Sequence, residues 1–405
     1  MSRFTFFAEK PVRPYHKGDV LFVASVIILC GLGLVSLYVC TPYKAERLFG
    51  SSLYFVRRQM AWAAVGLAGM IAFSVMPVRV MKRILPALVI GTLILCLMTL
   101  VPGIGDSRKG APRWIRIPVI GTVQPSEFSK MALVLFLANL FDKIQRQDDE
   151  FKNEQRDFLY PLIGLMVFVM VIFLQKDFST GLFIFAVGCI MFFVSGARML
   201  WIFPLLSLAV PAAVLMVVME PYRLMRVVAF FKPEDFLLTS GYQRFASRRA
   251  IIAGGFWGNG MGSGMQYVNS IPEVQADYIF AGWTNVMGFV GVIAYAAVLF
   301  VFAWRAFRIA LTCPCRFASY SAYGSAIVIV FQSLINIGVV CGALPTTGIP
   351  LPFFSSGGSS LLATMCMCGI IINASCCDED DEMESVRKYS ERNIESFNGV
   401  VVENE

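Results

Sequence analysis

The stretch Val20–Cys40 reads VLFVASVIILCGLGLVSLYVC and contains no charged side chain. A helix needs about 20 apolar residues to cross the hydrocarbon core of a bilayer. Within that core every backbone N–H and C=O must be hydrogen-bonded inside the protein, which favours a helix over an open strand. The stretch therefore predicts a membrane-spanning helix.

Nine further apolar runs follow along the chain, at residues 59–76, 84–101, 126–141, 158–174, 180–195, 200–219, 278–304, 319–341 and 359–374. Hydrophobic residues make up 57% of the 405 residues and charged residues only 15%, and the mean hydropathy is +0.68. A soluble protein of this length carries far more charge. We therefore expect an all-α polytopic integral membrane protein with about ten transmembrane helices.

The chain is expected to comprise a cytoplasmic leader (residues 1–18), a transmembrane domain (19–375) and an acidic cytoplasmic tail (376–405). The basic leader and the missing cleavage site indicate a retained anchor, and an even number of spans returns the C-terminus to the same side. Lys and Arg show only a weak bias to the predicted inner loops. The tail's composition predicts disorder. One long extracytoplasmic loop, residues 220–277, separates the seventh and eighth spans.

Basic residues gather in the predicted outer loops, and they are Arg108, Lys109, Arg113, Arg116, Arg223, Arg226, Arg244, Arg248 and Arg249. Arginine forks match phosphate oxygens, so an anionic substrate such as a pyrophosphate would explain this excess. Contact with lipid headgroups explains any single arginine equally well. Among them Arg113 and Arg223 are selected as candidate substrate-binding residues.

The single histidine, His16, lies in the leader, so proton transfer on the outer face would depend on carboxylates. Ser270 and Glu273 have the spacing of a helix capping box, which predicts a structural role for Glu273. Asp277 lies next, directly before the apolar run at 278, and is the candidate general base. The alternative is an interfacial carboxylate paired with a nearby arginine.

Residues 242–252 can form an amphipathic helix along the membrane surface, with Gln243 and Ser247 on one face. Glycines then recur between positions 254 and 264, without the strand or the Gly-Lys-Ser/Thr ending of a nucleotide loop. Without a ligand, a flexible or tightly turned backbone beside the bilayer is expected for this segment.

Two opposite charges, Glu127 and Lys130, open the run at 126–141, where an ionisable pair suggests function but is also compatible with a structural ion pair. A second segment, residues 344–360, contains three prolines that forbid a regular helix. Irregular backbone at membrane depth is tolerated where it lines a cavity, so this segment is expected to wall a site. Its candidate ligand-binding residues are Thr346, Ser356, Gly357, Gly358 and Ser359. The cysteines show no metal-site spacing, and no metal ligands are predicted.

Three motifs together resemble the SEDS family (shape, elongation, division and sporulation proteins), whose members include FtsW, RodA and SpoVE. They are Gln-Pro-Ser-Glu-Phe-Ser-Lys at 124–130, Asp-Tyr-Ile-Phe-Ala at 277–281, and Leu-Pro-Phe at 351–353 with Ser-Gly-Gly-Ser-Ser at 356–360. The resemblance extends from about residue 19 to 374. Pro-Thr-Thr-Gly at 345–348 is closer to the division-type FtsW members than to the elongation-type RodA members.

The resemblance implies a peptidoglycan glycosyltransferase that polymerises lipid II on the outer face of the bacterial cytoplasmic membrane during septal wall synthesis. Asp277 would activate the acceptor sugar hydroxyl, and undecaprenyl pyrophosphate would leave. No cofactor is firmly implied, although a divalent cation, Mg²⁺ or Mn²⁺, could help to balance the pyrophosphate. The implied partners are lipid II, a class B penicillin-binding protein as transpeptidase, other division proteins and membrane lipids, with no nucleic acid.

The chain departs from the family pattern near its candidate base. Gln275 and Ala276 replace a usual His-Thr, no acidic residue follows in the segment 283–286, and Ser356 replaces a tyrosine. Two other functions stay open. A lipid II flippase or other transporter would also use intramembrane charges, and a non-catalytic division scaffold would recruit the transpeptidase without needing Asp277.

Overall fold

Six helices of the computed structural model are long and apolar enough to cross a membrane: α1 (Val20–Cys40), α3 (Tyr54–Val75), α4 (Val78–Met98), α13 (Ile279–Thr312), α14 (Arg316–Val340) and α15 (Gly358–Ser375). The described residues are 18–108, 111–117, 121–146, 154–196, 207, 211, 214–232, 236 and 241–377. Helices α5 (Pro125–Arg146), α6 (Glu154–Leu174) and α7 (Phe178–Val194) complete the bundle.

These helices confirm the prediction of a mostly helical protein with many spans, and they coincide with nine of the ten apolar runs. Helix α1 has the predicted bounds, and Asp19 caps it by accepting a 2.9 Å hydrogen bond from the backbone N–H of Phe22. Most of the run at 200–219 lies outside the described residues, as do residues 1–17 of the leader and 378–405 of the tail.

A small antiparallel sheet between α4 and α5 was not predicted. Its strands are β1 (Gly105–Arg108), β2 (Ala111–Ile117) and β3 (Gly121–Val123), in the order β1-β2-β3. Gly105 and Val123 both pair with Ile115 of the central strand. A search for long apolar runs does not detect short strands that contain charged residues, so it could not predict this sheet.

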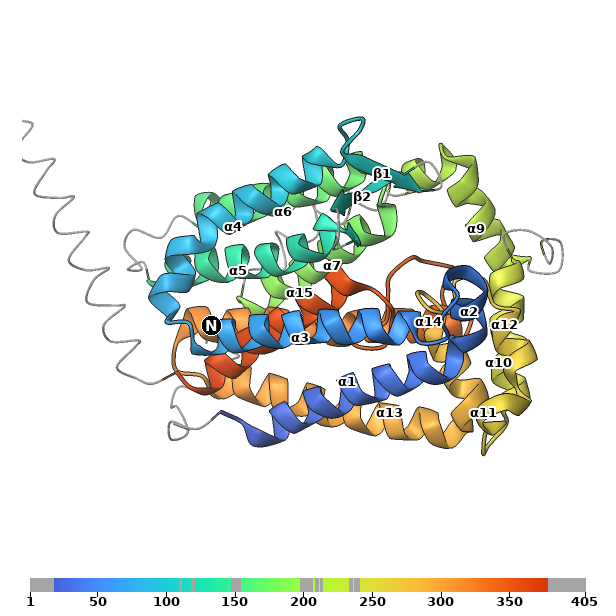
Figure 1. Cartoon of the computed structure of the whole chain (residues 1–405). Coiled ribbons are helices and arrows are strands. Elements are labelled where there is room, and N and C mark those ends of the chain that lie inside the picture. The colour runs from blue at the N-terminus through green and yellow to red at the C-terminus, as the bar shows by residue number, and fades with distance from the viewer. Residues whose placement is uncertain are drawn as a thin grey trace, which may run out of the picture.

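The short elements gather at one end of the bundle, which we name the loop end. In Figure 1, α2 (Pro42–Phe49), α9 (Pro221–Phe231), α10 (Tyr242–Gly254), α11 (Gly260–Ser263) and α12 (Met265–Asn269) lie at the right, across the ends of the spanning helices. Helix α10 matches the predicted amphipathic helix. At the opposite end, the N–H of Asp19 lies 3.4 Å from Ser375 Oγ, so the two ends of the described chain lie on one face.

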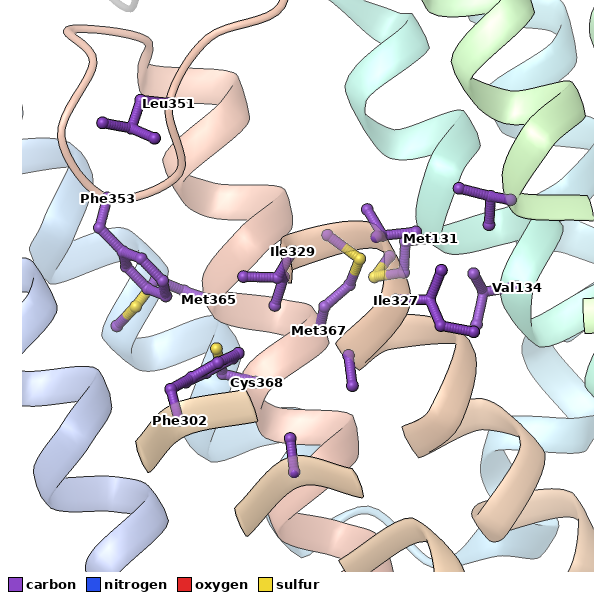
Figure 2. Close-up of a cluster of buried hydrophobic side chains, with 14 of the residues drawn as sticks. Met131, Val134, Phe302, Ile327, Ile329, Leu351, Phe353, Met365, Met367 and Cys368 are labelled. Carbon is purple, nitrogen blue, oxygen red and sulfur yellow. The ribbon is translucent and has the colours of Figure 1, made fainter. Parts of the chain in front are cut away.

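Helix α15 occupies the centre of the hydrophobic core. Figure 2 shows Met365, Met367 and Cys368 among side chains from α5, α13 and α14, with Leu351 and Phe353 entering from the loop before α15. Phe353 has a φ of +66°, and its carbonyl lies so close to α1 that a Cβ on Gly33 would overlap it. The loop is therefore clamped between α1 and the core.

Helix α13 is broken at Gly288, whose φ of +65° interrupts the helical hydrogen bonds. The glycine-rich segment fills this break: Phe289 N–H donates to Gly255 O at 3.0 Å, and Asn259 N–H donates to Asn285 O at 3.0 Å. Side chains on Gly254 or Gly258 would overlap the α13 backbone. The glycines thus allow two backbones to meet and satisfy each other's polar groups.

We predict that Gly33→Ala destabilises the protein by about 1–3 kcal/mol, because the new methyl group overpacks the Phe353 backbone. Gly31→Ala is the matched control: it lies two residues earlier on α1, where an added Cβ meets nothing within 4 Å. Thermal unfolding of the purified protein in detergent measures both. Equal melting temperatures for the two variants would contradict the clamp.

Candidate functional site

Asp277 lies at the loop end, one residue before Tyr278, which is the N-cap of α13. The aspartate is half-buried. Its backbone carbonyl accepts a 3.0 Å hydrogen bond from Nδ2 of Asn336 on α14. A Cβ placed on Gly348, an exposed residue, would lie 3.9 Å from Asp277 Oδ2. The candidate base therefore faces the proline-containing segment that the sequence had singled out.

The predicted capping box before Asp277 is wrong. Residues 270–278 form turns, and α13 begins only at Ile279. Glu273 has a φ of +53°, which a residue in the first turn of a helix does not adopt. Its carboxylate accepts a 2.9 Å hydrogen bond from Gln275 Nε2, and Ser270 Oγ donates to Tyr267 O at 2.7 Å. Local turn bonds have replaced the expected cap.

Residues 344–357, which we name the proline loop, are fastened to the segment around Asp277. Ser355 Oγ donates to Ala276 O at 2.5 Å, and the N–H of Ser356 donates to Gln275 O at 2.8 Å. Gln59 of α3 donates to Ser355 O at 3.1 Å. Two motifs that are almost 80 positions apart in sequence thus form one wall.

The predicted ligand-binding residues of this region have defined structural contacts. Thr346 O accepts from Arg226 Nη1 at 3.4 Å, and Ser359 Oγ accepts from the N–H of Gln124 at 3.3 Å. Gly357 is the N-cap of α15. A side chain on Gly358 would overlap the Trp62 ring. Their binding of a substrate stays a prediction.

Arginines surround this wall. Arg244 donates to Phe230 O and to Gly342 O, both at 2.8 Å. Burial and the Asp277 carboxylate raise the pKa of the Tyr278 hydroxyl, whereas the Arg226 and Arg244 charges lower it. Both guanidinium groups therefore act on the same hydroxyl as the Asp277 carboxylate. The sequence placed both arginines on the outer side without selecting either as a site residue.

The two selected arginines are held further along the loop end. Arg113 donates to Lys176 O at 2.6 Å and lies 3.4 Å from Asp177 Oδ1. Arg223 donates to Met216 O at 3.1 Å and lies 5.2 Å from the centre of the Phe178 ring. These contacts do not test whether either arginine belongs to the same site as Asp277, so that membership stays a prediction.

Gln243 and Ser247 fix helix α10 in place. Gln243 Nε2 donates to Pro272 O at 3.0 Å. Ser247 is fully buried and donates to Val340 O, at the end of α14, at 3.0 Å. Their described contacts are therefore with the protein itself, and a role in substrate binding is untested.

Glu127 and Lys130 form a buried ion pair inside the bundle. Both residues are 3% exposed, and Lys130 Nζ lies 2.8 Å from Glu127 Oε2. Lys130 also donates to Gln332 Oε1 at 2.7 Å, and Gln332 Nε2 donates to Pro350 O at 2.8 Å. The pair thus connects through one side chain to the proline loop.

Sequence reasoning missed Gln332 and Asn336 on α14. The available signal was two amide residues four positions apart inside an apolar run, because polar side chains at membrane depth usually have a specific partner. Among the described residues, no group of three or more His, Cys, Asp or Glu side chains could hold a metal ion.

The sequence of this chain is similar to a known protein family along nearly its whole length. The family model described as cell cycle protein, FtsW/RodA/SpoVE, matches residues 19–379. A "Probable peptidoglycan glycosyltransferase FtsW" of Trichlorobacter lovleyi is 36% identical over 91% of this chain and 95% of its own. "Stage V sporulation protein E" of Bacillus subtilis is 33% identical over 88% of this chain and 96% of its own.

Solved structures share the fold. One chain comes from work described as "Structural coordination of polymerization and crosslinking by a peptidoglycan synthase complex"; it is 26% identical, with a TM-score of 0.71, over 88% of this chain and 97% of its own. The rod shape determining protein RodA of Thermus thermophilus gives a TM-score of 0.64 at 24% identity, over 88% of this chain and 96% of its own. This second likeness shows the fold alone.

We predict that Lys130→Met destabilises the protein by roughly 3–5 kcal/mol, because it leaves Glu127 buried without its cation. The double variant Lys130→Met with Glu127→Gln removes the stranded charge and is expected to recover a large part of the loss. Melting temperatures in detergent test both. If the double variant is no more stable than the single one, the charge is not what the lysine compensates.

Proposed function

The chain belongs to the FtsW/RodA/SpoVE family, the SEDS proteins, and on this premise we propose that it is a peptidoglycan glycosyltransferase that polymerises lipid II. The reaction takes place on the outer face of the cytoplasmic membrane, at the loop end of the bundle. The relatives named as probable peptidoglycan glycosyltransferases support this activity, since they match over about nine-tenths of this chain.

The observation that carries the proposal is the setting of Asp277. A half-buried carboxylate lies at the end of the bundle next to an exposed glycine, and two arginines act on the hydroxyl of the adjacent Tyr278. A general base needs an accessible carboxylate in a defined geometry, and an anionic leaving group needs fixed positive charge. Both requirements meet at this position.

In the proposed reaction, the Asp277 carboxylate accepts the proton of the acceptor sugar hydroxyl. The hydroxyl oxygen forms a bond to the anomeric carbon of the donor, and the bond from that carbon to the pyrophosphate oxygen breaks. Undecaprenyl pyrophosphate leaves with the electron pair. In this proposal Arg226 and Arg244 stabilise the charge of the leaving group, and Arg113 and Arg223 are further candidates along the same end.

The protein is proposed to act in septal wall synthesis, with both termini in the cytoplasm and a class B penicillin-binding protein as its transpeptidase. The FtsW names of several relatives support a division role. A similar chain from a peptidoglycan synthase complex supports a partner. Other division proteins and membrane lipids are the remaining expected contacts. A divalent cation at the pyrophosphate would take most of its ligands from substrate and water, and no step above depends on it.

We predict that Asp277→Asn lowers the rate of lipid II polymerisation by about 10²–10⁴-fold, the usual contribution of a general base. The assay uses purified protein with its transpeptidase partner and measures glycan chain formation. Asp106→Asn is a matched control, because Asp106 is a loop-end carboxylate that pairs with Arg116 in the sheet. Both variants are checked for folding and partner binding.

The outcomes separate the candidate functions. Chains from the wild type and from Asp106→Asn, but not from Asp277→Asn, would support the polymerase. An absence of chains from the wild type, where a related polymerase is active, would contradict the proposal and favour a flippase or a scaffold. Full division function with Asp277→Asn would favour the scaffold.

We also predict that Gly348→Leu lowers kcat/KM roughly tenfold or more, a loss of ~1.4 kcal/mol in transition-state stabilisation. The new side chain would extend from a position 3.9 Å from Asp277 Oδ2 into the open side of the site. Gly31→Leu is the control, since it adds the same bulk to an exposed stretch of α1 with nothing within 4 Å. Unchanged kinetics for Gly348→Leu would show that substrate does not approach Asp277 from this side.

A further inference from the structure

Two buried amide side chains on α14 hold the backbone around the candidate base. Gln332 and Asn336 are one helical turn apart, and each is 2% exposed. Polar side chains inside a membrane bundle are costly unless they are hydrogen-bonded, so such a pair calls for an explanation. Neither residue belongs to the motifs singled out in the sequence.

Asn336 joins two segments of the chain with one NH₂ group. Its Nδ2 donates to Asp277 O at 3.0 Å and to Ile349 O at 2.9 Å. Ile349 directly follows Gly348, the residue that faces the Asp277 carboxylate. One amide group therefore joins the start of α13 to the proline loop, beside the bonds that Ser355 and Ser356 make to residues 276 and 275.

Gln332 holds the next carbonyl of the same loop. Its Nε2 donates to Pro350 O at 2.8 Å, and its Oε1 accepts from Lys130 of the buried ion pair at 2.7 Å. Prolines at 345, 350 and 352 remove backbone donors, so this loop cannot satisfy its own carbonyls with regular structure. Amide side chains supply the missing donors at Ile349 and Pro350.

We propose that Asn336 is a positioning residue for Asp277: it fixes the aspartate relative to the proline loop, so that the carboxylate meets the acceptor hydroxyl in a reactive geometry. The inference rests on the proposed glycosyltransferase function. Asn336 Oδ1 is buried without a partner among the described residues, so the role depends on the NH₂ donors alone. A displacement of about 1 Å at a reacting group costs up to roughly 10²-fold in rate.

The chain offers a matched control for a purely structural role. Asn373 of α15 is 9% exposed, and its Nδ2 donates to Ser74 O at 3.0 Å and to Met76 O at 2.8 Å. Like Asn336, it therefore donates two hydrogen bonds from one amide group to two backbone carbonyls, although the acceptors are different residues. Its bonds are at the end of the bundle opposite Asp277, near the C-terminal end of α3.

The experiment compares Asn336→Leu with Asn373→Leu in the polymerisation assay, with the transpeptidase partner present. Leucine keeps the approximate volume and removes both donors. Melting temperature, kcat and KM for lipid II are measured for each. We expect similar decreases in melting temperature, a kcat about 10–100-fold lower for Asn336→Leu with KM within about threefold of wild type, and a nearly unchanged kcat for Asn373→Leu.

A second pair, Asn336→Ser and Asn373→Ser, keeps one hydroxyl donor and serves if the leucine variants fail to fold. Equal kcat values within a pair would overturn the positioning role, and so would a loss confined to KM. If the wild type forms no chains while a related polymerase does, the proposed function itself fails. If the wild type is active and the Asn336 variants are unimpaired, only the positioning role fails.

Discussion

Backbone carbonyls without nearby N–H donors are the constraint on which the loop end of this protein depends. The proline loop enters the bundle with three residues that cannot donate, and each unpaired buried carbonyl would cost ~1–3 kcal/mol. Three side chains from two other helices, α3 and α14, supply donors: Gln59 to Ser355 O, Asn336 to Ile349 O and Gln332 to Pro350 O. Satisfying this loop is also what draws α3, α14 and the Asp277 segment together.

The same requirement explains the break in α13. Gly288 frees backbone groups within a spanning helix, and the segment from Gly254 to Gly258 lies against the break and pairs with them. Glycine is needed on both sides because the two backbones are in contact. The glycine-rich segment is therefore a packing element that places α10 and α12 at the loop end, in agreement with the expectation of a tightly turned backbone.

The buried charges inside the bundle also need polar partners. The ion pair of Glu127 and Lys130 is costly to bury, and its lysine gains a second hydrogen-bond partner in Gln332. Since Gln332 also holds the proline loop, hydrogen bonds connect the membrane-embedded pair with the wall of the site. The loop end is thus supported by polar contacts that extend into the apolar core shown in Figure 2.

The sequence by itself indicated nine of the helices in the bundle, the helical character of residues 242–252 and the choice of Asp277, because apolar length, amphipathic spacing and the few outer carboxylates can be read along the chain. Only the tertiary structure decided which polar groups meet. The two bonds of Asn336 depend on partners distant in sequence, and local propensity carries no information about them. The sheet at 105–123 and the turn at Glu273 are made by bonds between nearby residues, which neither apolar runs nor the capping-box spacing indicated. Asp277 and Gly348 lie on two segments that Asn336, Ser355 and Ser356 join by hydrogen bonds, and these contacts exist only once α13, α14 and the proline loop have packed.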